Sequence, residues 1–409
     1  MKFLFPTQKY TENRQKQANL PMITLLLMIS FATFNAVLFT PALPNITRYF
    51  SITNNIAQLT ITWFLVGYAI GQLLYGPLAN RLGRKPSLYI GIGIQIASSF
   101  LCILAGLLHS FFLLVSARFF LAIGSGVGLT IAFTLVNESF VPKVANQKIS
   151  YLMLALSIMP GLSIALGGIL NHHYGWMSCF YVGVVYGLVL LFLTTRLTET
   201  YSMPNPKALK FKCLIQTYFN QLQNPALVFG GLLMGGATCF IYIFTTLAPF
   251  IAIDSLGMNS SEYGIASILP PIGSVIGSLV SAQLAKKYSY QYGIRLGILI
   301  AGISVILMVL VTWFIPRNPL LTLFFPVFLI CVGLSLIYAN ASIFAMSNTV
   351  DKAHGSAVMN FINLTLVTLS VLSLCLFSST QHLLLSIYTL IIAGMIIIYR
   401  FIQFKQDKR

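Results

Sequence analysis

Acidic residues are scarce in this chain of 409 residues. Only 7 residues are Asp or Glu, and charged residues of both signs make up 8% of the sequence, whereas soluble globular proteins have roughly 25%. A soluble domain with so little charge would expose apolar surface that polar side chains could not cover. Apolar residues account for 57% of the chain, and its mean hydropathy is +0.86. The composition therefore excludes a soluble protein and predicts an integral membrane protein.

Patterns that would indicate a metal site or an enzyme are also lacking. The six cysteines are scattered without metal-ligand spacing, and we expect them to be small apolar packing residues. The glycine-rich run 124–128 lies within an apolar segment, so close helix packing is its expected role rather than phosphate binding. No catalytic constellation stands out. We therefore predict no enzyme activity, no metal and no cofactor.

Long apolar segments occur twelve times. Each reaches the roughly 20 residues that a helix needs to cross the hydrocarbon core, and none shows the alternation of barrel strands. The first begins near Met22 and is too long for the core of a signal peptide, so no cleavable signal is expected. We predict an all-α integral membrane protein with twelve transmembrane helices. The expected spans are 22–44, 57–78, 87–108, 111–136, 149–171, 177–196, 226–250, 263–283, 296–315, 319–345, 356–378 and 382–402.

The basic residues predict the orientation in the membrane. When loops are assigned alternately to two sides, 21 of the 24 Lys and Arg residues fall on the side of both termini. Only Arg48 and Arg317 fall on the other side, and Arg118 lies within a span. The positive-inside rule then predicts a multi-pass protein of the bacterial inner membrane with both termini cytoplasmic. The net charge of +17 reflects topology and attraction to anionic lipid, and we expect no nucleic acid partner.

A hydrophilic stretch divides the spans into two sets of six. The expected parts are a cytoplasmic tail at 1–21, a six-helix bundle at 22–196, a cytoplasmic linker at 197–225, a second six-helix bundle at 226–402 and a cytoplasmic tail at 403–409. Similar features recur in the two halves at an offset of about 205–209 residues, among them Pro41 and Pro249 at the ends of their helices. Such parallel repeats are typical of transporters whose two bundles rock about a site near the membrane midplane.

The turn after the second span carries the most specific motif. Residues 71–86 read Gly-Gln-Leu-Leu-Tyr-Gly-Pro-Leu-Ala-Asn-Arg-Leu-Gly-Arg-Lys-Pro. The glycines allow a tight reversal between close helices, and cations at a cytoplasmic helix end can hold one conformation. The segment resembles the signature loop of the major facilitator superfamily, in particular its bicyclomycin-resistance (Bcr/CflA) type drug:proton antiporters. The candidate gating-loop residues are Gly76, Asn80, Arg81, Gly83, Arg84 and Lys85.

Further segments support this resemblance in chain order. Thr-Pro-Ala-Leu-Pro at 40–44 is similar to the end of helix 1 in that branch, and Arg118 is similar to the arginine of the family's helix 4 motif. The resemblance implies the major facilitator fold of two pseudo-symmetric six-helix bundles, and proton antiport. Four residues in the fifth span resemble the helix 5 motif associated with antiporters. We expect a bend and a close contact between the bundles at these residues, although ordinary helix packing explains their presence nearly as well. These residues are Pro160, Gly161, Gly167 and Gly168.

The chain departs from the family pattern at acidic positions. The loop motif usually has an aspartate where this chain has Asn80, and helix 1 of the branch often has one near the position of Val37. No buried carboxylate therefore awaits a lipophilic cation, which makes such a substrate less expected than usual. A neutral or anionic substrate that faces Arg118 fits the sequence better.

Arg118 is the only Lys, Arg, Asp, Glu or His well inside a span. An arginine at a helix centre costs roughly 2.5–3.5 kcal/mol, so it is kept only where it faces protein or water. One interpretation places Arg118 in the central cavity, where it orients polar groups or responds to the protonation of a neighbour. The alternative is a structural arginine that bonds backbone carbonyls of adjacent helices. We favour the cavity interpretation.

Other polar and aromatic residues in the spans are weaker candidates. We expect amides to line the cavity, aromatics to form a substrate wall, and an acid at the cytoplasmic end of helix 4 to take part in coupling, because buried polar groups need partners. These candidates are Asn35, Asn340, Tyr242, Tyr338, Phe34, Phe39 and Glu138. Asp254 and Glu262 lie near the opposite mouth, where simple solvation is the more expected role.

The sequence favours one function and leaves two alternatives. We expect a secondary active transporter that exports a small amphipathic molecule or drug by alternating access, driven by a proton gradient and working as a monomer. The first alternative is a transporter for an anionic metabolite or a carboxylate siderophore, in either direction. The second is a membrane receptor without transport, which is the least expected because the hydrophilic segments are too short for a signalling domain.

Overall fold

The computed structural model describes residues 20–200, 221–315, 318–346, 352–377 and 380–407. We call 20–200 the N-half and 221–407 the C-half. The N-half contains α2 (Met22–Val37), η2 (Thr40–Ala42), α3 (Leu43–Phe50), α4 (Asn54–Ala57), α5 (Leu59–Leu82), α6 (Arg84–Leu107), α7 (Phe111–Ser125), α8 (Val127–Ser139), α9 (Pro142–Tyr174) and α10 (Ser178–Thr195). The C-half contains α12 (Pro225–Pro249), η3 (Phe250–Ser255), α13 (Ser260–Ala266), α14 (Leu269–Leu284), α15 (Tyr290–Phe314), η4 (Leu320–Phe324), α16 (Phe325–Met346), α17 (Lys352–Leu374) and α18 (Gln381–Asp407).

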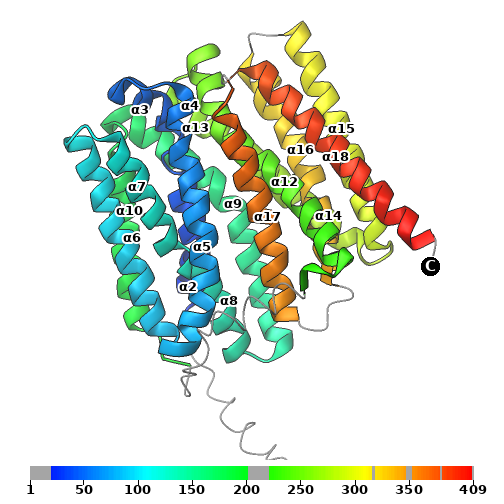
Figure 1. Ribbon diagram of the computed structural model, residues 1–409, viewed down its shortest axis with the longest axis horizontal. Coiled ribbons are helices and arrows are strands. Elements are labelled where there is room, and N and C mark those ends of the chain that lie inside the picture. The colour runs from blue at the N-terminus through cyan, green and yellow to red at the C-terminus, as the bar shows by residue number, and fades with distance from the viewer. Residues whose placement is uncertain (1–19, 201–220, 316–317, 347–351, 378–379, 408–409) are drawn as a thin grey trace, which may run out of the picture.

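The helices have the lengths and polarity of membrane spans. Within the described ranges, 11 helical runs are long and apolar enough to cross a bilayer. The twelfth expected span, 356–378, corresponds to α17, whose apolar part Val358–Leu374 is shorter. Large apolar side chains such as Phe192 and Ile306 are more than half exposed, as bilayer-facing residues are expected to be. All elements of the described residues are helical, so the predicted all-α architecture is confirmed. Figure 1 shows the two halves standing side by side.

Several helices extend beyond the predicted spans. α18 continues to Asp407, so the tail expected at 403–409 is mostly helical, and α9 begins at Pro142, before the expected span at 149. Hydropathy marks the part of a helix that crosses lipid, whereas backbone hydrogen bonding continues into the polar zone outside it. The expected N-terminal tail and linker lie mostly outside the described residues.

Helix 1 is interrupted inside the expected span 22–44. α2 ends at Val37, and the chain passes through η2 before it becomes helical again in α3. Pro41 lacks an N–H, which removes a helical hydrogen bond, and the Thr40 hydroxyl instead donates to the Val37 carbonyl at 2.8 Å. In the C-half, α12 ends at Pro249 and continues as the π-helical turn η3. The two halves therefore change helix type at corresponding prolines.

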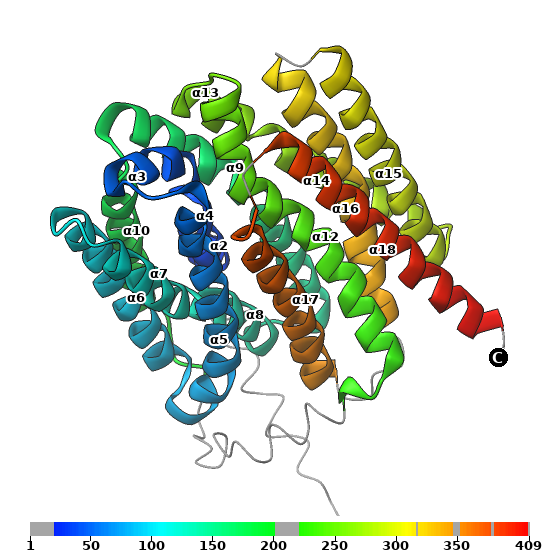
Figure 2. The same ribbon diagram turned by 45° about the horizontal axis from the view of Figure 1, so that its top comes forward.

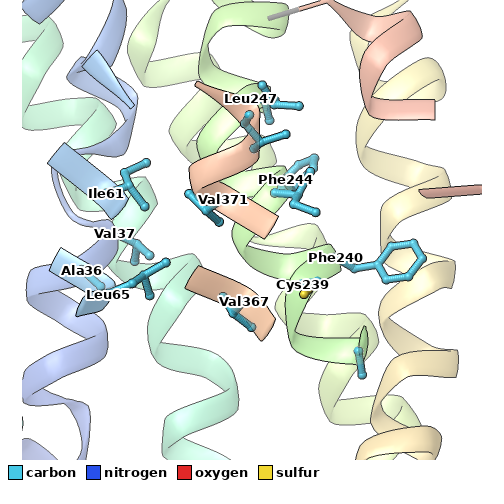
Figure 3. Close-up of a cluster of buried hydrophobic side chains, with 14 of the residues drawn as sticks. Ala36, Val37, Ile61, Leu65, Cys239, Phe240, Phe244, Leu247, Val367 and Val371 are labelled. Atoms are coloured by element: carbon cyan, nitrogen blue, oxygen red, sulfur yellow. The ribbon is translucent and has the colours of Figure 1, made fainter. Parts of the chain in front are cut away.

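The two halves share a buried apolar core. We call the end with Arg84 and Lys286 the basic end, and the end with Arg48 and Asp254 the opposite end. One buried apolar cluster extends through both halves, whereas a second cluster belongs to the N-half alone and lies near its basic end. Helices α5 and α17 pack together (Figure 1, Figure 2). Figure 3 shows the shared cluster, with Val371 of α17 between Ile61 of α5 and Phe244 of α12.

Candidate functional site

Polar contacts join the halves at the opposite end. The Arg48 guanidinium donates to the Asp254 carboxylate at 2.7 Å, and the Asn171 amide donates to the Ser260 hydroxyl at 2.8 Å. Asp254 is therefore paired across the halves. The other rim acid, Glu262, accepts from the backbone N–H of Asn259 in a capping box at the start of α13. We expected from the sequence that both acids would simply be solvated. The structure instead gives each of them a hydrogen-bond partner.

The helix 5 glycines lie where α9 meets other segments. Gly161 packs against Ile268 and Pro271, and Gly168 packs against the Ser260 carbonyl, all across the boundary between the halves. Gly167 faces the break in helix 1 within the N-half. α9 remains a single helix through Pro160. Small residues thus permit close approach of backbones here, while their expected part in rocking stays a prediction.

Three tyrosines from both halves converge at the boundary between them. Tyr68 of α5, Tyr242 of α12 and Tyr338 of α16 lie within electrostatic range of one another. The side chain of Gln72 lies close to the Tyr68 hydroxyl. Tyr242 and Tyr338 are partly exposed, and within the described chain no hydrogen-bond partner is found for their hydroxyls. We refer to these three residues as the tyrosine cluster.

Arg118 lies inside the N-half rather than between the halves. Its side chain is 1% exposed and donates to the carbonyl oxygens of Asn35 at 2.7 Å and Ala36 at 3.2 Å. The guanidinium carbon lies 3.9 Å from the Phe39 ring centre and 4.4 Å from that of Phe64. The two carbonyls belong to the C-terminal end of α2, where helical donors are lacking and the helix dipole favours a cation. These contacts match the structural interpretation, and a role in transport stays a prediction.

Asn35 and Phe34 also point into the N-half. The Asn35 amide donates to the Phe31 carbonyl at 2.8 Å and accepts from the Gln95 side chain at 3.1 Å. Phe34 stacks on Tyr186 of α10 with ring centres 4.5 Å apart. Both are buried by N-half neighbours, so the structure does not place them on a wall between the halves. Gln95 was not among the predicted site residues, because a lone amide in an apolar helix carries no motif.

Asn340 occupies the corresponding interior of the C-half. Its amide donates to the Ser281 hydroxyl at 3.1 Å and to the Leu336 carbonyl at 2.9 Å. The side chain lies directly against Gly293 of α15. Asn340 therefore ties α14, α15 and α16 together, and it is 5% exposed rather than cavity-lining.

Arg84 organises the predicted gating loop at the basic end. Its guanidinium pairs with the Glu138 carboxylate at 2.5 Å. It also donates to the Ala79 carbonyl at 2.6 Å and to the Asn80 side-chain oxygen at 3.0 Å. Gly83 has a φ of 105°, a conformation that glycine adopts without strain. The structure thus brings Asn80, Gly83, Arg84 and Glu138 together.

A second carboxylate, Glu199, holds the same loop from the segment that follows α10. It accepts from the backbone N–H groups of Arg84 at 3.0 Å and Lys85 at 2.8 Å, at the N-terminus of α6. The Lys85 ammonium donates to the Thr195 carbonyl at 2.8 Å. Arg81 is exposed, and Gly76 has open space beside it. Glu199 was not among the predicted site residues, because its partner lies more than a hundred residues away along the chain.

Solved transporter structures share this fold. The chain aligns with the inward-open conformation of the xylose transporter XylE from E. coli with a TM-score of 0.72, 12% identity, and coverage of 93% of this chain and 95% of that one. The POT family transporter PepTSo aligns with a TM-score of 0.69, 16% identity, and coverage of 95% and 99%. At these identities the likeness shows the fold alone.

Curated relatives are transporters and resistance proteins. Multidrug resistance protein D of Escherichia coli (strain K12) is 24% identical over 335 residues, which cover 81% of this chain and 82% of that protein. Chloramphenicol resistance protein CraA of Acinetobacter baumannii is 26% identical over 351 residues, 83% of this chain and 82% of that protein. An uncharacterized transporter of Rickettsia felis is 29% identical over 276 residues, and the chain spans 66% of its length.

A family profile matches most of the chain. The match extends over residues 25–366 and is described as Major Facilitator Superfamily. It includes the loop at 71–86, Arg118 and the helix 5 glycines on which the predicted resemblance rests. That prediction is confirmed, as is the expectation of a transporter family rather than an enzyme family. The chain belongs to the Major Facilitator Superfamily.

Proposed function

We propose that this protein is a secondary transporter that works by alternating access. The observation that carries the proposal is the position of the described polar contacts between the halves, which lie at the opposite end. The halves share polar contacts and Gly168 packing at the opposite end, while the N-half keeps a separate core near the basic end. Rocking that separates Arg48 from Asp254 and closes the basic end would expose the tyrosine cluster to the other side.

The proposed orientation follows from the charge distribution. The basic end faces the cytoplasm under the positive-inside rule, which places both termini inside and the Arg48–Asp254 pair outside. In the proposed cycle, the pairing of Arg48 with Asp254 supports a state that is closed on the outside. We propose that the protein acts as a monomer in the bacterial inner membrane.

The proposed cargo is a small amphipathic molecule that leaves the cell. The names of two relatives, multidrug resistance protein D and chloramphenicol resistance protein CraA, support export, and the family resemblance supports coupling to protons. An anionic metabolite is less favoured, because Arg118 directs its donors to backbone carbonyls.

Transport by the purified protein in proteoliposomes tests this function. A pH gradient is imposed, and chloramphenicol, a lipophilic cation and a panel of carboxylates are followed into the vesicles. We expect gradient-driven accumulation of chloramphenicol and no accumulation of the carboxylates. If only a carboxylate accumulates, the proposed amphipathic cargo is wrong and the transporter of an anionic metabolite takes its place. If no compound moves, the transport proposal itself is overturned.

Charge reversal at the opposite end is expected to shift the proposed equilibrium. Arg48→Asp or Asp254→Arg alone places like charges together in the closed state, whereas the double variant restores an attractive pair. Because exposed ion pairs contribute about 0.2–1 kcal/mol, each single reversal should raise the population open at this end by about 1.4- to fivefold. The readout is the labelling rate of Ser260→Cys by an impermeant maleimide. Equal rates in single and double variants would contradict a latch at this pair.

A further inference from the structure

Two exposed arginines stand at the basic end of the C-half, Arg295 on α15 and Arg400 on α18. Neither forms a salt bridge with a described acidic side chain. Arg84 at the same end of the N-half differs, because it is buried and paired with Glu138. The next acid along α18 is Asp407, seven residues and about 10 Å of helix beyond Arg400. The two cations therefore have no counter-charge among the described side chains.

A hydrogen bond between α15 and α18 brings the two arginines to the same level. The buried Tyr399 phenol donates to the Gln291 carbonyl at 3.3 Å and accepts from the Gln403 amide at 3.0 Å. Arg400 follows Tyr399 in the chain, and Arg295 lies one helical turn from Gln291 on the same side of α15. The two helices pack together (Figure 1), and both guanidinium groups lie within electrostatic range of the Tyr399 phenol. The cations thus flank one point between the helices.

Both arginines belong to exposed faces that are otherwise apolar. The exposed residues of α15 recur every three or four positions, which places them on one face of the helix. They are Tyr292, Arg295, Leu299, Ile303 and Ile306. On α18, Arg400 lies beside the exposed Ile397 and Phe401. Each cation therefore adjoins a surface that contacts acyl chains when the helices span a membrane.

Aromatic rings mark the level of the lipid headgroups at this place. Tyr288 and Tyr292 are both exposed and stack with their ring centres 4.6 Å apart. Tyrosine is enriched where hydrocarbon meets the polar zone. Arg295 lies one turn beyond Tyr292, so its long side chain can return the guanidinium to the level of the phosphates. Lys286 and Lys287 precede the rings and are also exposed, which adds positive charge at the same level.

We propose that Arg295 and Arg400 form a binding site for one anionic phospholipid of the leaflet at the basic end. The lipid phosphate lies between the two guanidinium groups, whose fixed N–H donors suit phosphate oxygens. The acyl chains lie over the apolar faces of α15 and α18. The surplus of positive charge selects phosphatidylglycerol over phosphatidylethanolamine, whose ammonium group would be repelled. This site lies on the outer surface of the C-half and goes beyond the proposed transport function.

Lipid titration of the purified full-length protein in detergent tests the proposed site. Native mass spectrometry counts the bound lipids, and dioleoyl phosphatidylglycerol is compared with dioleoyl phosphatidylethanolamine, which has the same chains and phosphate. We expect phosphatidylglycerol to bind at least about fivefold more tightly. An excess of inorganic phosphate at constant ionic strength should not displace it, because phosphate has no acyl chains. Equal binding of the two lipids, or displacement by phosphate, would overturn the proposal.

Charge removal at the two arginines locates the bound lipid. Arg295→Gln and Arg400→Gln should each weaken phosphatidylglycerol binding about fivefold, and the double variant about 25-fold. The matched control combines Arg81→Gln with Arg196→Gln, which removes two exposed arginines from the basic end of the N-half. We expect the control to keep the wild-type affinity. Unchanged binding in the first double variant, or an equal loss in the control, would show that no specific site exists at Arg295 and Arg400.

Thermal unfolding supplies a second readout and confirms that each variant is folded. A ligand that binds only the folded protein raises its unfolding midpoint. Phosphatidylglycerol should therefore raise the midpoints of the wild type and the control, and raise that of the Arg295→Gln/Arg400→Gln variant much less. An equal rise in all three proteins would contradict the proposed site.

Discussion

Gly167→Ala is expected to prevent the N-half from folding into a stable bundle. A Cβ atom at Gly167 would overlap the carbonyl oxygen of Leu38, in the interrupted part of helix 1. The Leu38 oxygen is a backbone atom and the backbone of α9 fixes the position of the new Cβ, so neither atom can turn away as the end of a flexible side chain could. Overpacking of a core typically costs about 1–3 kcal/mol, and we expect a loss at or above about 3 kcal/mol here because α9 and α2 must move apart.

Gly93→Ala supplies the matched control for this substitution. Gly93 lies within α6, and a Cβ there would meet nothing within 4 Å. Alanine favours a helix over glycine by about 0.5–1 kcal/mol, so this variant should be as stable as the wild type or slightly more so. Thermal unfolding of the purified proteins, with the yield of folded protein from membranes, measures both. Equal unfolding midpoints for the two variants would show that Gly167 is not needed for the close packing of α9 against helix 1.

Arg118→Ala is expected to destabilise the protein as well as to stop transport. The substitution leaves the carbonyls of Asn35 and Ala36 without their side-chain donors, and an unsatisfied buried acceptor costs about 1–3 kcal/mol. It also empties the space between the rings of Phe39 and Phe64. We expect a total loss of about 2–5 kcal/mol, seen as a fall of about 5–15 °C in the unfolding midpoint.

Two further variants separate the roles of Arg118. Arg118→Lys keeps the cation but loses the planar fork that reaches two carbonyls and stacks on rings, so it should recover only part of the stability. Arg196→Ala removes an exposed arginine at the end of α10 and should leave the midpoint unchanged. If Arg118→Ala abolished transport while the unfolding midpoint stayed at the wild-type value, the cavity interpretation would be restored and the structural one would fail.

The architecture could be predicted because its cause is local in sequence. An apolar run of sufficient length must be a spanning helix, since lipid offers no partner for an unpaired backbone group. The proline at 41 likewise indicated the end of helix 1, although not that the chain would turn helical again in α3. Helix ends in the polar zone were missed at α9 and α18, because no change in hydropathy marks them.

The candidate site was harder to predict because it depends on how helices are rotated. Asn35 and Asn340 had the composition expected of cavity residues, yet each faces the interior of its own half. Packing decides which face of a helix meets which neighbour. In a membrane helix all faces are apolar, so the sequence does not indicate which face is buried. Tyr68 was missed for the same reason, whereas Tyr242 and Tyr338 were named only as aromatics.

The placement of charge also bears on how the protein responds to membrane voltage. A charge that moves across the membrane field exchanges about 2.3 kcal/mol per elementary charge per 100 mV. Arg118 is bonded to α2 within the N-half, and the described acids lie toward the helix ends. The proposed rocking motion would therefore carry little protein charge through the field. Under the proposed function, an electrical signature of turnover should come from the cargo or from coupled protons, so current recorded with an uncharged cargo would test for proton coupling directly.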